Sequence, residues 1–191
     1  MYLNNISWFM VRTFSNQKLV TGQKAPHFTL KGIDEKNYSL NDFNSRTLLV
    51  IFICNHCPFV KARINDIVVL QSTFNTDDLQ IIAINSNDPS YQDEGFDNMK
   101  EFAKQNNLNF PYLIDETQEI AKLYGAVCTP DPFLFDSNKT LVFHGRINDA
   151  MEPGSKPQKH IMHENIKKIL NVERIEKDFD PSIGCSIKWK E

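Results

Sequence analysis

The sequence lacks several features that mark common classes of protein. Its 191 residues contain no apolar run of the roughly 20 residues needed to cross a bilayer. No Gly/Ser-rich or Pro-rich linker divides the chain, and 21 basic against 24 acidic residues leave a net charge of −3. We therefore expect no membrane span and no nucleic-acid partner. With 41% hydrophobic residues, the chain predicts one domain with a sizeable core.

Cysteine is also scarce, and its four copies are unevenly placed. Cys54 and Cys57 form a pair, whereas Cys128 and Cys185 stand alone. A small secreted domain held together by disulfides would carry cysteines densely along the chain. A close pair with two distant single cysteines is more typical of redox or metal chemistry.

The first twenty residues lack the features of a secretory signal peptide, which are a basic start, a continuous apolar stretch and a small-residue cleavage site. They contain Arg12 and Lys18 but no acidic residue, so an organelle transit peptide is an alternative to a packed or disordered extension. We expect a cytoplasmic protein with an extension over residues 1–20, a domain over 21–171 and a tail over 172–191 that packs on the domain.

The hydrophobic pattern predicts an alternation of strands and helices. The apolar runs 48–53 and 79–84 do not alternate with polar residues, as expected for strands buried on both faces. Helical spacing of apolar residues occurs in four segments, which are 57–74, 96–106, 118–124 and 159–170. Further strands are expected at 26–30 and 37–40 in an N-terminal hairpin, at 112–114, and at 133–135 and 141–143 in a second hairpin. This order predicts an α/β fold with a central mixed sheet flanked by helices.

The pair Cys54 and Cys57 lies where the buried strand 48–53 turns into a helix. Unpaired backbone N–H groups and the helix dipole favour a thiolate at a helix N-terminus. We expect Cys54 nearest this end as the nucleophile and Cys57, one turn inside, as the resolving thiol. His56 lies between them and would stabilise a thiolate when protonated.

A single C-x-x-C is also half of a zinc site, but the second half is missing from the sequence. His160 and His163 are spaced as H-x-x-H on a predicted helix with no further ligand nearby in sequence, which favours solvated side chains. A redox dithiol is therefore the preferred interpretation of Cys54 and Cys57.

The order of elements resembles a thioredoxin-like fold. In that fold a cis-proline loop lies beside the dithiol, and Thr129-Pro130 stands at the corresponding place. The resemblance implies a cis bond before Pro130. It also implies that the backbone of Thr129 binds the substrate peptide.

Several motifs resemble more closely the redoxin branch, the alkyl hydroperoxide reductase/thiol-specific antioxidant superfamily, and within it a subgroup with a Cys-Asn-His-Cys-Pro motif. They are Gly22-Gln-Lys-Ala-Pro-His-Phe28, Tyr38-Ser-Leu-Asn-Asp42, Cys54-Asn-His-Cys-Pro-Phe-Val-Lys61, Cys128-Thr-Pro-Asp-Pro-Phe-Leu-Phe-Asp136, Gly145-Arg-Ile-Asn-Asp149 and Pro181-Ser-Ile-Gly-Cys-Ser-Ile-Lys-Trp-Lys190. The match extends from about residue 20 onward. The resemblance implies a thiol-dependent oxidoreductase without a bound organic cofactor.

The sequence departs from both relatives at the site. The strand 48–53 lacks the acid that is buried beneath the thioredoxin disulfide, so the sequence leaves open which group accepts protons from the dithiol. In peroxiredoxins the peroxide-reactive cysteine aligns with Cys57. Their peroxide-binding Arg near Asp131 is absent, and Arg146 is its nearest substitute in sequence. Arg146 could instead bind an acidic substrate group or pair with Asp149.

The two single cysteines have competing interpretations. Cys128, two residues before Pro130, either fills space in the core or joins Cys54, Cys57 and His56 in holding a soft metal. Cys185 lies in a short apolar stretch of the tail, where packing is favoured over a role as a distal resolving thiol.

We therefore predict a thiol–disulfide oxidoreductase that uses Cys54 and Cys57, with His56, Cys128, Thr129, Pro130 and Arg146 as auxiliary residues. Its partners would be protein or small-molecule disulfides and a separate thiol reductant. The alternatives are a thiol peroxidase centred on Cys57, with peroxides as substrates, and a metal-binding redoxin.

Overall fold

The computed structural model describes residues 12–191 of the chain, and residues 1–11 lie outside the description. The transit-peptide alternative for residues 1–20 falls largely on those first eleven residues and stays untested. Within residues 12–191, no helix is both long enough and apolar enough to cross a membrane.

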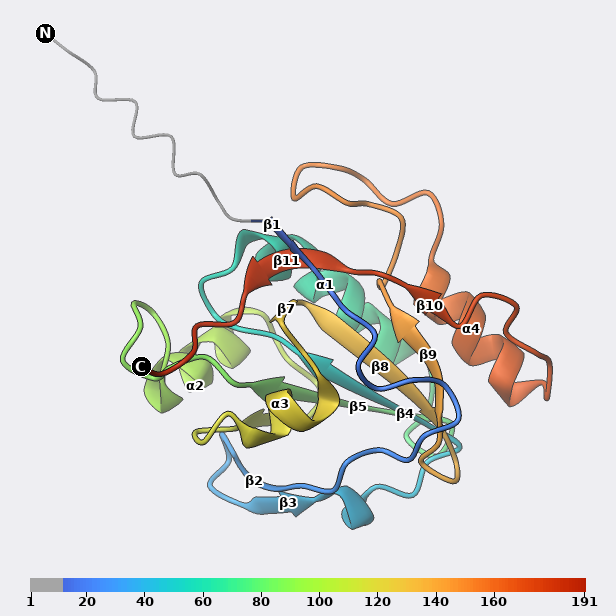
Figure 1. Cartoon of the computed structure of the whole chain (residues 1–191), viewed down its shortest axis with the longest axis horizontal. Coiled ribbons are helices and arrows are strands. Elements are labelled where there is room, and N and C mark those ends of the chain that lie inside the picture. The colour runs from blue at the N-terminus through green and yellow to red at the C-terminus, as the bar shows by residue number, and fades with distance from the viewer. Residues whose placement is uncertain (1–11) are drawn as a thin grey trace, which may run out of the picture.

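A mixed sheet with the strand order β10-β9-β8-β4-β5-β6-β2-β3 forms the centre of the molecule (Figure 1). Its strands are β2 (Thr29–Gly32), β3 (Asn37–Ser39), β4 (Thr47–Phe52), β5 (Leu79–Asn85), β6 (Tyr112–Ile114), β8 (Asp131–Asp136), β9 (Leu141–Gly145) and β10 (Phe179–Asp180). β4 pairs in parallel with β5 and antiparallel with β8, and all its residues are buried. This central position accounts for the continuous apolar run of β4. The predicted mixed sheet and the N-terminal hairpin of β2 and β3 are confirmed.

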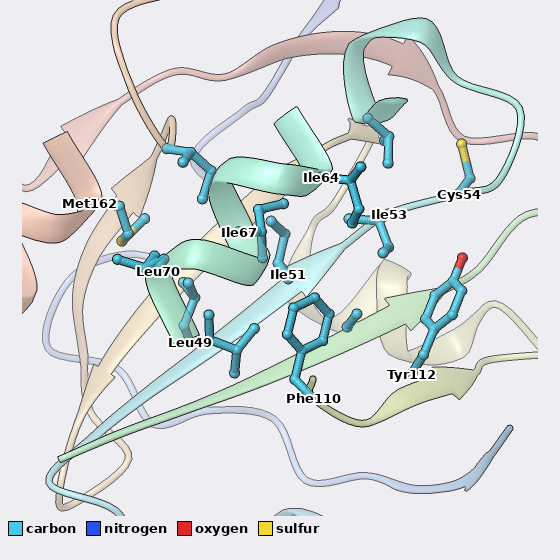
Figure 2. Close-up of a cluster of buried hydrophobic side chains, with 14 of the residues drawn as sticks. Leu49, Ile51, Ile53, Cys54, Ile64, Ile67, Leu70, Phe110, Tyr112 and Met162 are labelled. Carbon is cyan, nitrogen blue, oxygen red and sulfur yellow. The ribbon is translucent and has the colours of Figure 1, made fainter. Parts of the chain in front are cut away.

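Helices cover both faces of this sheet, so two core layers form. The helices are α1 (Pro58–Thr73), α2 (Phe96–Gln105), α3 (Glu119–Tyr124) and α4 (Ile161–Leu170), and a short 3₁₀ helix, η1 (Leu40–Asp42), follows β3. Side chains of α1, α2 and α4 belong to one layer, and those of α3 belong to the other. Figure 2 shows the first layer, where Leu49 and Ile51 of β4 pack near Ile67 of α1. Each such side chain stabilises the fold by about 1.5–3 kcal/mol, so the strand that leads to the cysteines is rigidly held.

A second, smaller sheet was not predicted from the sequence. It consists of β1 (Arg12–Phe14), β11 (Ile183–Ser186) and β7 (Cys128–Thr129), with β11 in the middle and both pairings antiparallel. Segments from the two ends of the chain thus meet beside the loop that follows α3. The expected domain boundaries at residues 20 and 172 stay predictions.

Candidate active site

The two paired cysteines lie in the turn between β4 and α1. Cys57 is the N-cap of α1, and Pro58 occupies the first turn, where its fixed φ angle and missing N–H cost nothing. The helix therefore begins after the second cysteine, and the expectation that Cys54 is nearest to it was wrong. The N-terminal N–H groups of α1 act first on Cys57.

The loop before Pro130 lies against both sulfur atoms. The Thr129–Pro130 peptide bond is cis. Cys54 Sγ lies 3.1 Å from Thr129 Oγ1, and Cys57 Sγ lies 3.3 Å from the Thr129 carbonyl oxygen. Both cysteines are buried, with exposed fractions of 1% for Cys54 and 0% for Cys57. Thr129 is thus the residue that joins the two cysteines to the proline loop.

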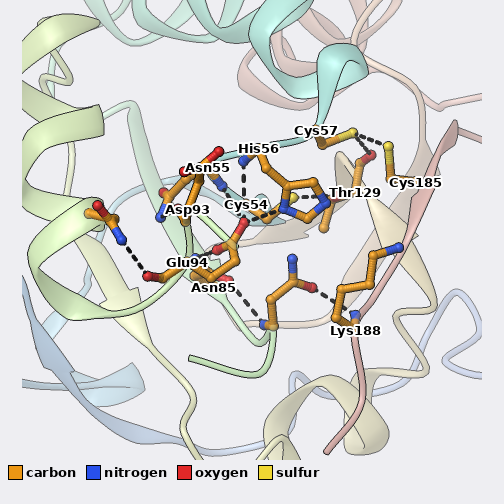
Figure 3. A network of polar contacts seen from close by, with 12 residues as sticks. Cys54, Asn55, His56, Cys57, Asn85, Asp93, Glu94, Thr129, Cys185 and Lys188 are labelled. Carbon is orange, nitrogen blue, oxygen red and sulfur yellow. Dashed lines mark hydrogen bonds and ion pairs between the residues drawn. The ribbon is translucent and has the colours of Figure 1, made fainter. Parts of the chain in front are cut away.

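Cys185 supplies a third thiol at this site (Figure 3). Its Sγ lies 2.8 Å from Cys57 Sγ, although 128 positions separate the two residues in sequence. The sequence placed Cys185 in a tail segment that packs on the body, but it gave no signal for the residue against which it packs.

Burial and hydrogen bonding act in opposite directions on these thiols. Burial raises the pKa of Cys57, but hydrogen bonds from the Cys185 and Cys54 thiols and from the backbone N–H of Val60 outweigh it, so the net pKa is well below its ordinary value. Burial and the neighbouring Cys57 thiolate raise the pKa of Cys54. The hydrogen bond to Cys57, together with burial, raises the pKa of Cys185. These opposite shifts favour the thiolate on Cys57 and the protonated thiol on Cys54 and Cys185.

A buried acid, Glu94, stands beside the pair. The Glu94 side chain is 0% exposed, and its Oε1 accepts hydrogen bonds from the backbone N–H groups of Asn55 (3.0 Å) and His56 (3.2 Å). Its Oε2 accepts from Asn85 Nδ2 at 2.7 Å. Sequence reasoning missed Glu94 because it lies in the polar loop after β5, whereas the acid was sought in strand 48–53.

The two residues between the cysteines have separate tasks. Asn55 is buried, accepts a hydrogen bond from the Tyr112 hydroxyl (2.9 Å) and donates one to the Asp93 carbonyl (3.1 Å), so it anchors the turn. His56 is partly exposed, and its Nδ1 lies 2.5 Å from Glu94 Oε1. The imidazole thus sits at the surface side of the dithiol with its orientation fixed by a buried carboxylate.

Cys128 lies in β7 next to Thr129 and is completely buried. Burial, together with the negative charge of Asp131, raises the pKa of its thiol. Asp131 itself pairs with His144, whose Nε2 lies 2.8 Å from Asp131 Oδ1 in the core. Cys128 therefore has the environment of a protonated core thiol, which agrees with the space-filling interpretation.

Arg146 is held by residues away from the cysteines. Its guanidinium contacts Asp180 Oδ1 at 2.8 Å and Met151 Sδ at 2.8 Å. The pairing with Asp149 considered from the sequence was wrong, because Asp149 accepts the backbone N–H groups of Gln158 and Lys159 instead. Arg146, which the sequence suggested as a substitute for the peroxide-binding Arg, thus forms an ion pair with Asp180 of β10.

The potential metal ligands that the structure brings together differ from those expected. Within residues 12–191, the grouped ligand atoms belong to Cys54, His56 and Glu94 and lie within 4.8 Å of one another, whereas Cys57 and Cys128 are not part of the group. The Glu94 oxygen that faces the group already accepts from two backbone N–H groups and from the imidazole. This arrangement satisfies the carboxylate by hydrogen bonds and fits a dithiol site better than a metal site.

Comparisons with proteins of known sequence and structure place this site in a wider context. The thiol-disulfide oxidoreductase ResA of Bacillus thuringiensis subsp. konkukian is 27% identical over 126 residues, which are 66% of this chain and 69% of ResA. The crystal structure of an uncharacterized conserved protein from Geobacillus kaustophilus is 37% identical with a TM-score of 0.89 and covers 95% of this chain and 97% of that one. A hypothetical protein from Sinorhizobium meliloti 1021 is 35% identical with a TM-score of 0.88, covering 93% and 98%.

The thioredoxin domain of a thiol-disulfide oxidoreductase from Bacteroides vulgatus, 19% identical with a TM-score of 0.56, covers 66% of this chain and 88% of that one, and this likeness confirms the predicted thioredoxin-like fold. The ResA relatives support the predicted class of activity. The model of the AhpC/TSA family matches residues 21–144, which include β2 to β8, both paired cysteines and the Thr129–Pro130 loop. The chain therefore belongs to the AhpC/TSA family.

Proposed function

We propose that this protein is a thiol–disulfide oxidoreductase in which Cys54 and Cys57 exchange disulfides with protein or small-molecule substrates, and a separate thiol reductant resets the pair. The observation that carries the proposal is the position of Thr129, which contacts both sulfur atoms immediately before cis-Pro130. No bound organic cofactor takes part.

The first step is attack by Cys54 on the substrate disulfide. Cys57 is enclosed by Cys185 and by the Thr129 carbonyl, so Cys54 is the sulfur left to meet a substrate. Cys54 gives up its proton during the attack, and the substrate sulfur that leaves takes this proton up, because the lowered pKa of Cys57 makes its thiolate a poor base. A mixed disulfide forms between Cys54 and one substrate sulfur, and the other substrate sulfur leaves as a thiol.

The second step is resolution by Cys57. Its thiolate attacks Cys54 Sγ, the Cys54–Cys57 disulfide forms, and the second substrate sulfur leaves as a thiolate. Two electrons pass from the dithiol to the substrate. The helix N-terminus at Cys57 favours its thiolate and thereby assists this step.

Glu94 and His56 position the turn during this cycle. The carboxylate fixes the backbone N–H groups of Asn55 and His56, so Cys54 stays within reach of Thr129. Its negative charge also contributes to the raised pKa of Cys54, and this effect favours the protonated Cys54 thiol before the attack on the substrate. Because Cys54 is only 1% exposed, a substrate disulfide reaches it when the segments that cover it move aside.

Thiol peroxidase activity at Cys57 is less well supported. The lowered pKa of Cys57 suits a peroxide-reactive thiolate, but Arg146 is engaged with Asp180 and Met151. Arg146 is therefore not placed to stabilise the negative charge that develops on the leaving oxygen when a peroxide is cleaved.

A paired assay tests the proposal with wild-type protein, Cys54→Ser and Cys57→Ser. Dithiothreitol serves as the electron source. The catalysed reduction of a protein disulfide is expected to need both cysteines, so the rate with each variant should fall to the background rate of dithiothreitol alone. Peroxide consumption by the wild type is expected to stay at the level of free thiols. Cys128→Ala, which removes a core thiol, is the matched control and keeps disulfide reduction. Full disulfide reductase activity in Cys54→Ser would overturn the assignment of the nucleophile.

A further inference from the structure

The strand β11 occupies the edge of β7 beside the cis-proline loop. Cys185 is paired with Thr129 and Ser186 with Cys128, in antiparallel register. At Gly184 a Cβ atom would lie only 1.9 Å from the Thr129 carbonyl oxygen, so glycine alone allows this close approach. The tail is therefore fitted against the residue that also contacts both sulfurs of the dithiol.

The position of β11 is fixed by contacts on both sides of Cys185. β1 pairs along its outer edge, and the backbone N–H of Lys188 donates to Asn87 Oδ1 at 2.9 Å. Gln118 Nε2 donates to the Lys188 carbonyl at 2.8 Å. The contact between Cys185 and Cys57 is thus made by an anchored strand and not by a loose end.

Cys57 lies between two thiols. It is hydrogen-bonded to both Cys54 and Cys185, and the Sγ atoms of Cys57 and Cys185 are 2.8 Å apart. A disulfide bond is about 2.0 Å long. All four cysteines are free thiols in the structure. Bond formation between Cys57 and Cys185 requires only a small displacement, so Cys57 has two neighbouring sulfurs with which it could form a disulfide.

We propose that Cys185 is a third redox-active cysteine, which exchanges with the Cys54–Cys57 disulfide to give a Cys57–Cys185 disulfide and a free Cys54 thiol. The proposal rests on the proposed function, because the Cys54–Cys57 disulfide is the product of substrate reduction. The Cys185 thiolate attacks Cys57 Sγ, the Cys57–Cys185 bond forms, and the Cys54–Cys57 bond breaks. Cys54 leaves as a thiolate and takes up the proton that Cys185 lost, so no external oxidant is needed.

The charge on Cys57 couples this exchange to the redox state of the pair. In the reduced site the hydrogen bond to Cys57 is the main cause of the raised pKa of Cys185, and the thiol is kept protonated. In a Cys54–Cys57 disulfide, Cys57 carries no charge and this cause disappears, whereas the positive charge of Lys188 still favours a Cys185 thiolate. Oxidation of the pair therefore removes the largest cause that disfavours a Cys185 thiolate, and the exchange is favoured in the oxidised protein over the reduced one.

The exchange moves the disulfide toward the surface. Cys185 is 7% exposed, compared with 1% for Cys54 and 0% for Cys57. A separate thiol reductant then meets the disulfide at β11, and Cys54 regains its free thiol before the reductant arrives.

The test is disulfide mapping of the full-length protein after oxidation by one equivalent of oxidised dithiothreitol or diamide under native conditions. Free thiols are blocked in acid with N-ethylmaleimide, and the protein is digested with trypsin. The digestion places Cys54 and Cys57 in peptide 47–61, Cys128 in peptide 123–139 and Cys185 in peptide 178–188. The proposal predicts a cross-link between peptides 47–61 and 178–188 with N-ethylmaleimide on Cys54, beside the internal Cys54–Cys57 disulfide.

Two variants separate the specific contact from general oxidation. Cys54→Ser retains Cys57 and Cys185 and is expected to form the cross-link as its main product. The double variant Cys185→Ser/Ser186→Cys keeps the number of thiols but turns the thiol to the other face of β11, and its cross-link is expected to vanish.

The outcomes distinguish the two levels of the account. An internal Cys54–Cys57 disulfide with Cys185 fully labelled would overturn the redox role proposed for Cys185 and leave the proposed function standing. Absence of both disulfides in oxidised wild-type protein would overturn the proposed function and the exchange together. An equal cross-link in the double variant would show that random oxidation, and not the contact with Cys57, produces it.

Discussion

At the scale of single residues, the central feature is the buried Cys57, whose pKa is lowered and whose sulfur contacts Cys185 and the Thr129 carbonyl. The sequence assigned the thiolate to Cys54 and placed Cys57 one turn inside the helix. In the structure α1 begins at Pro58, close to the start that the apolar spacing predicted, so Cys57 is the cysteine next to the helix N-terminus, and Cys185 adds a neighbouring thiol that no local pattern could predict. The positions of the two paired cysteines were therefore predictable, but the distribution of protons between them was not.

This distribution can be measured by thiolate absorbance at 240 nm in the reduced protein. Because the pKa of Cys57 is lowered, one thiolate should persist as the pH falls well below the ordinary cysteine value of about 8.5. Cys57→Ser should lose this signal. Cys185→Ala removes a donor to the thiolate, so the transition should move to higher pH. A transition near the ordinary value in wild type, unchanged in Cys185→Ala, would contradict the assignment.

Glu94 provides a second test at this scale. Glu94→Ala leaves the buried N–H groups of Asn55 and His56 without their acceptor, which should lower the free energy of unfolding by about 1–3 kcal/mol. Loss of its charge should also lower the pKa of Cys54, which alkylation rates would report. The control is Glu116→Ala, at an exposed carboxylate, where urea unfolding should change by less than about 0.5 kcal/mol. Equal stability of the two variants would exclude a positioning role for Glu94.

At the scale of elements, the long and fully buried segments could be predicted and the short ones could not. β4 and α1 have patterns of continuous or helically spaced apolar residues, so their positions follow from the sequence. β7 and β11 have two and four residues, and their pairing joins positions far apart in the chain. Strands of this length have no detectable period, and long-range pairing depends on the whole fold.

Gly184 is the position in β11 where this pairing is most easily disturbed. An added Cβ meets the Thr129 carbonyl, so Gly184→Ala should displace β11 and lower the free energy of unfolding by about 1–3 kcal/mol. The displaced strand should also give less of the cross-link between Cys57 and Cys185. Gly154→Ala is the matched control, since a Cβ there meets nothing within 4 Å, and it should leave both quantities unchanged. If Gly184→Ala unfolded at the same urea concentration as Gly154→Ala, β11 would not be tightly packed on β7.

At the scale of the whole molecule, the site is assembled from four distant parts of the chain. The turn after β4 supplies the dithiol, the loop after β5 supplies Glu94, the loop before β8 supplies Thr129 and cis-Pro130, and the tail supplies Cys185. The sequence predicted the first and third parts through a motif and a family resemblance. The second part lies in a polar loop, where nothing in the local sequence distinguishes Glu94 from an ordinary loop residue. The fourth part carries a motif of the family resemblance, but that motif does not show that Cys185 contacts Cys57.

The central claim is that Cys54 attacks the substrate disulfide and Cys57 resolves the product, and trapping the mixed disulfide tests it most directly. Cys57→Ser is treated with oxidised glutathione under native conditions, quenched in acid and digested with trypsin. In this variant peptide 47–61 contains Cys54 as its single cysteine. The account predicts one stable glutathione adduct on peptide 47–61, whereas an adduct on the peptides of Cys128 or Cys185 with Cys54 unmodified would contradict it.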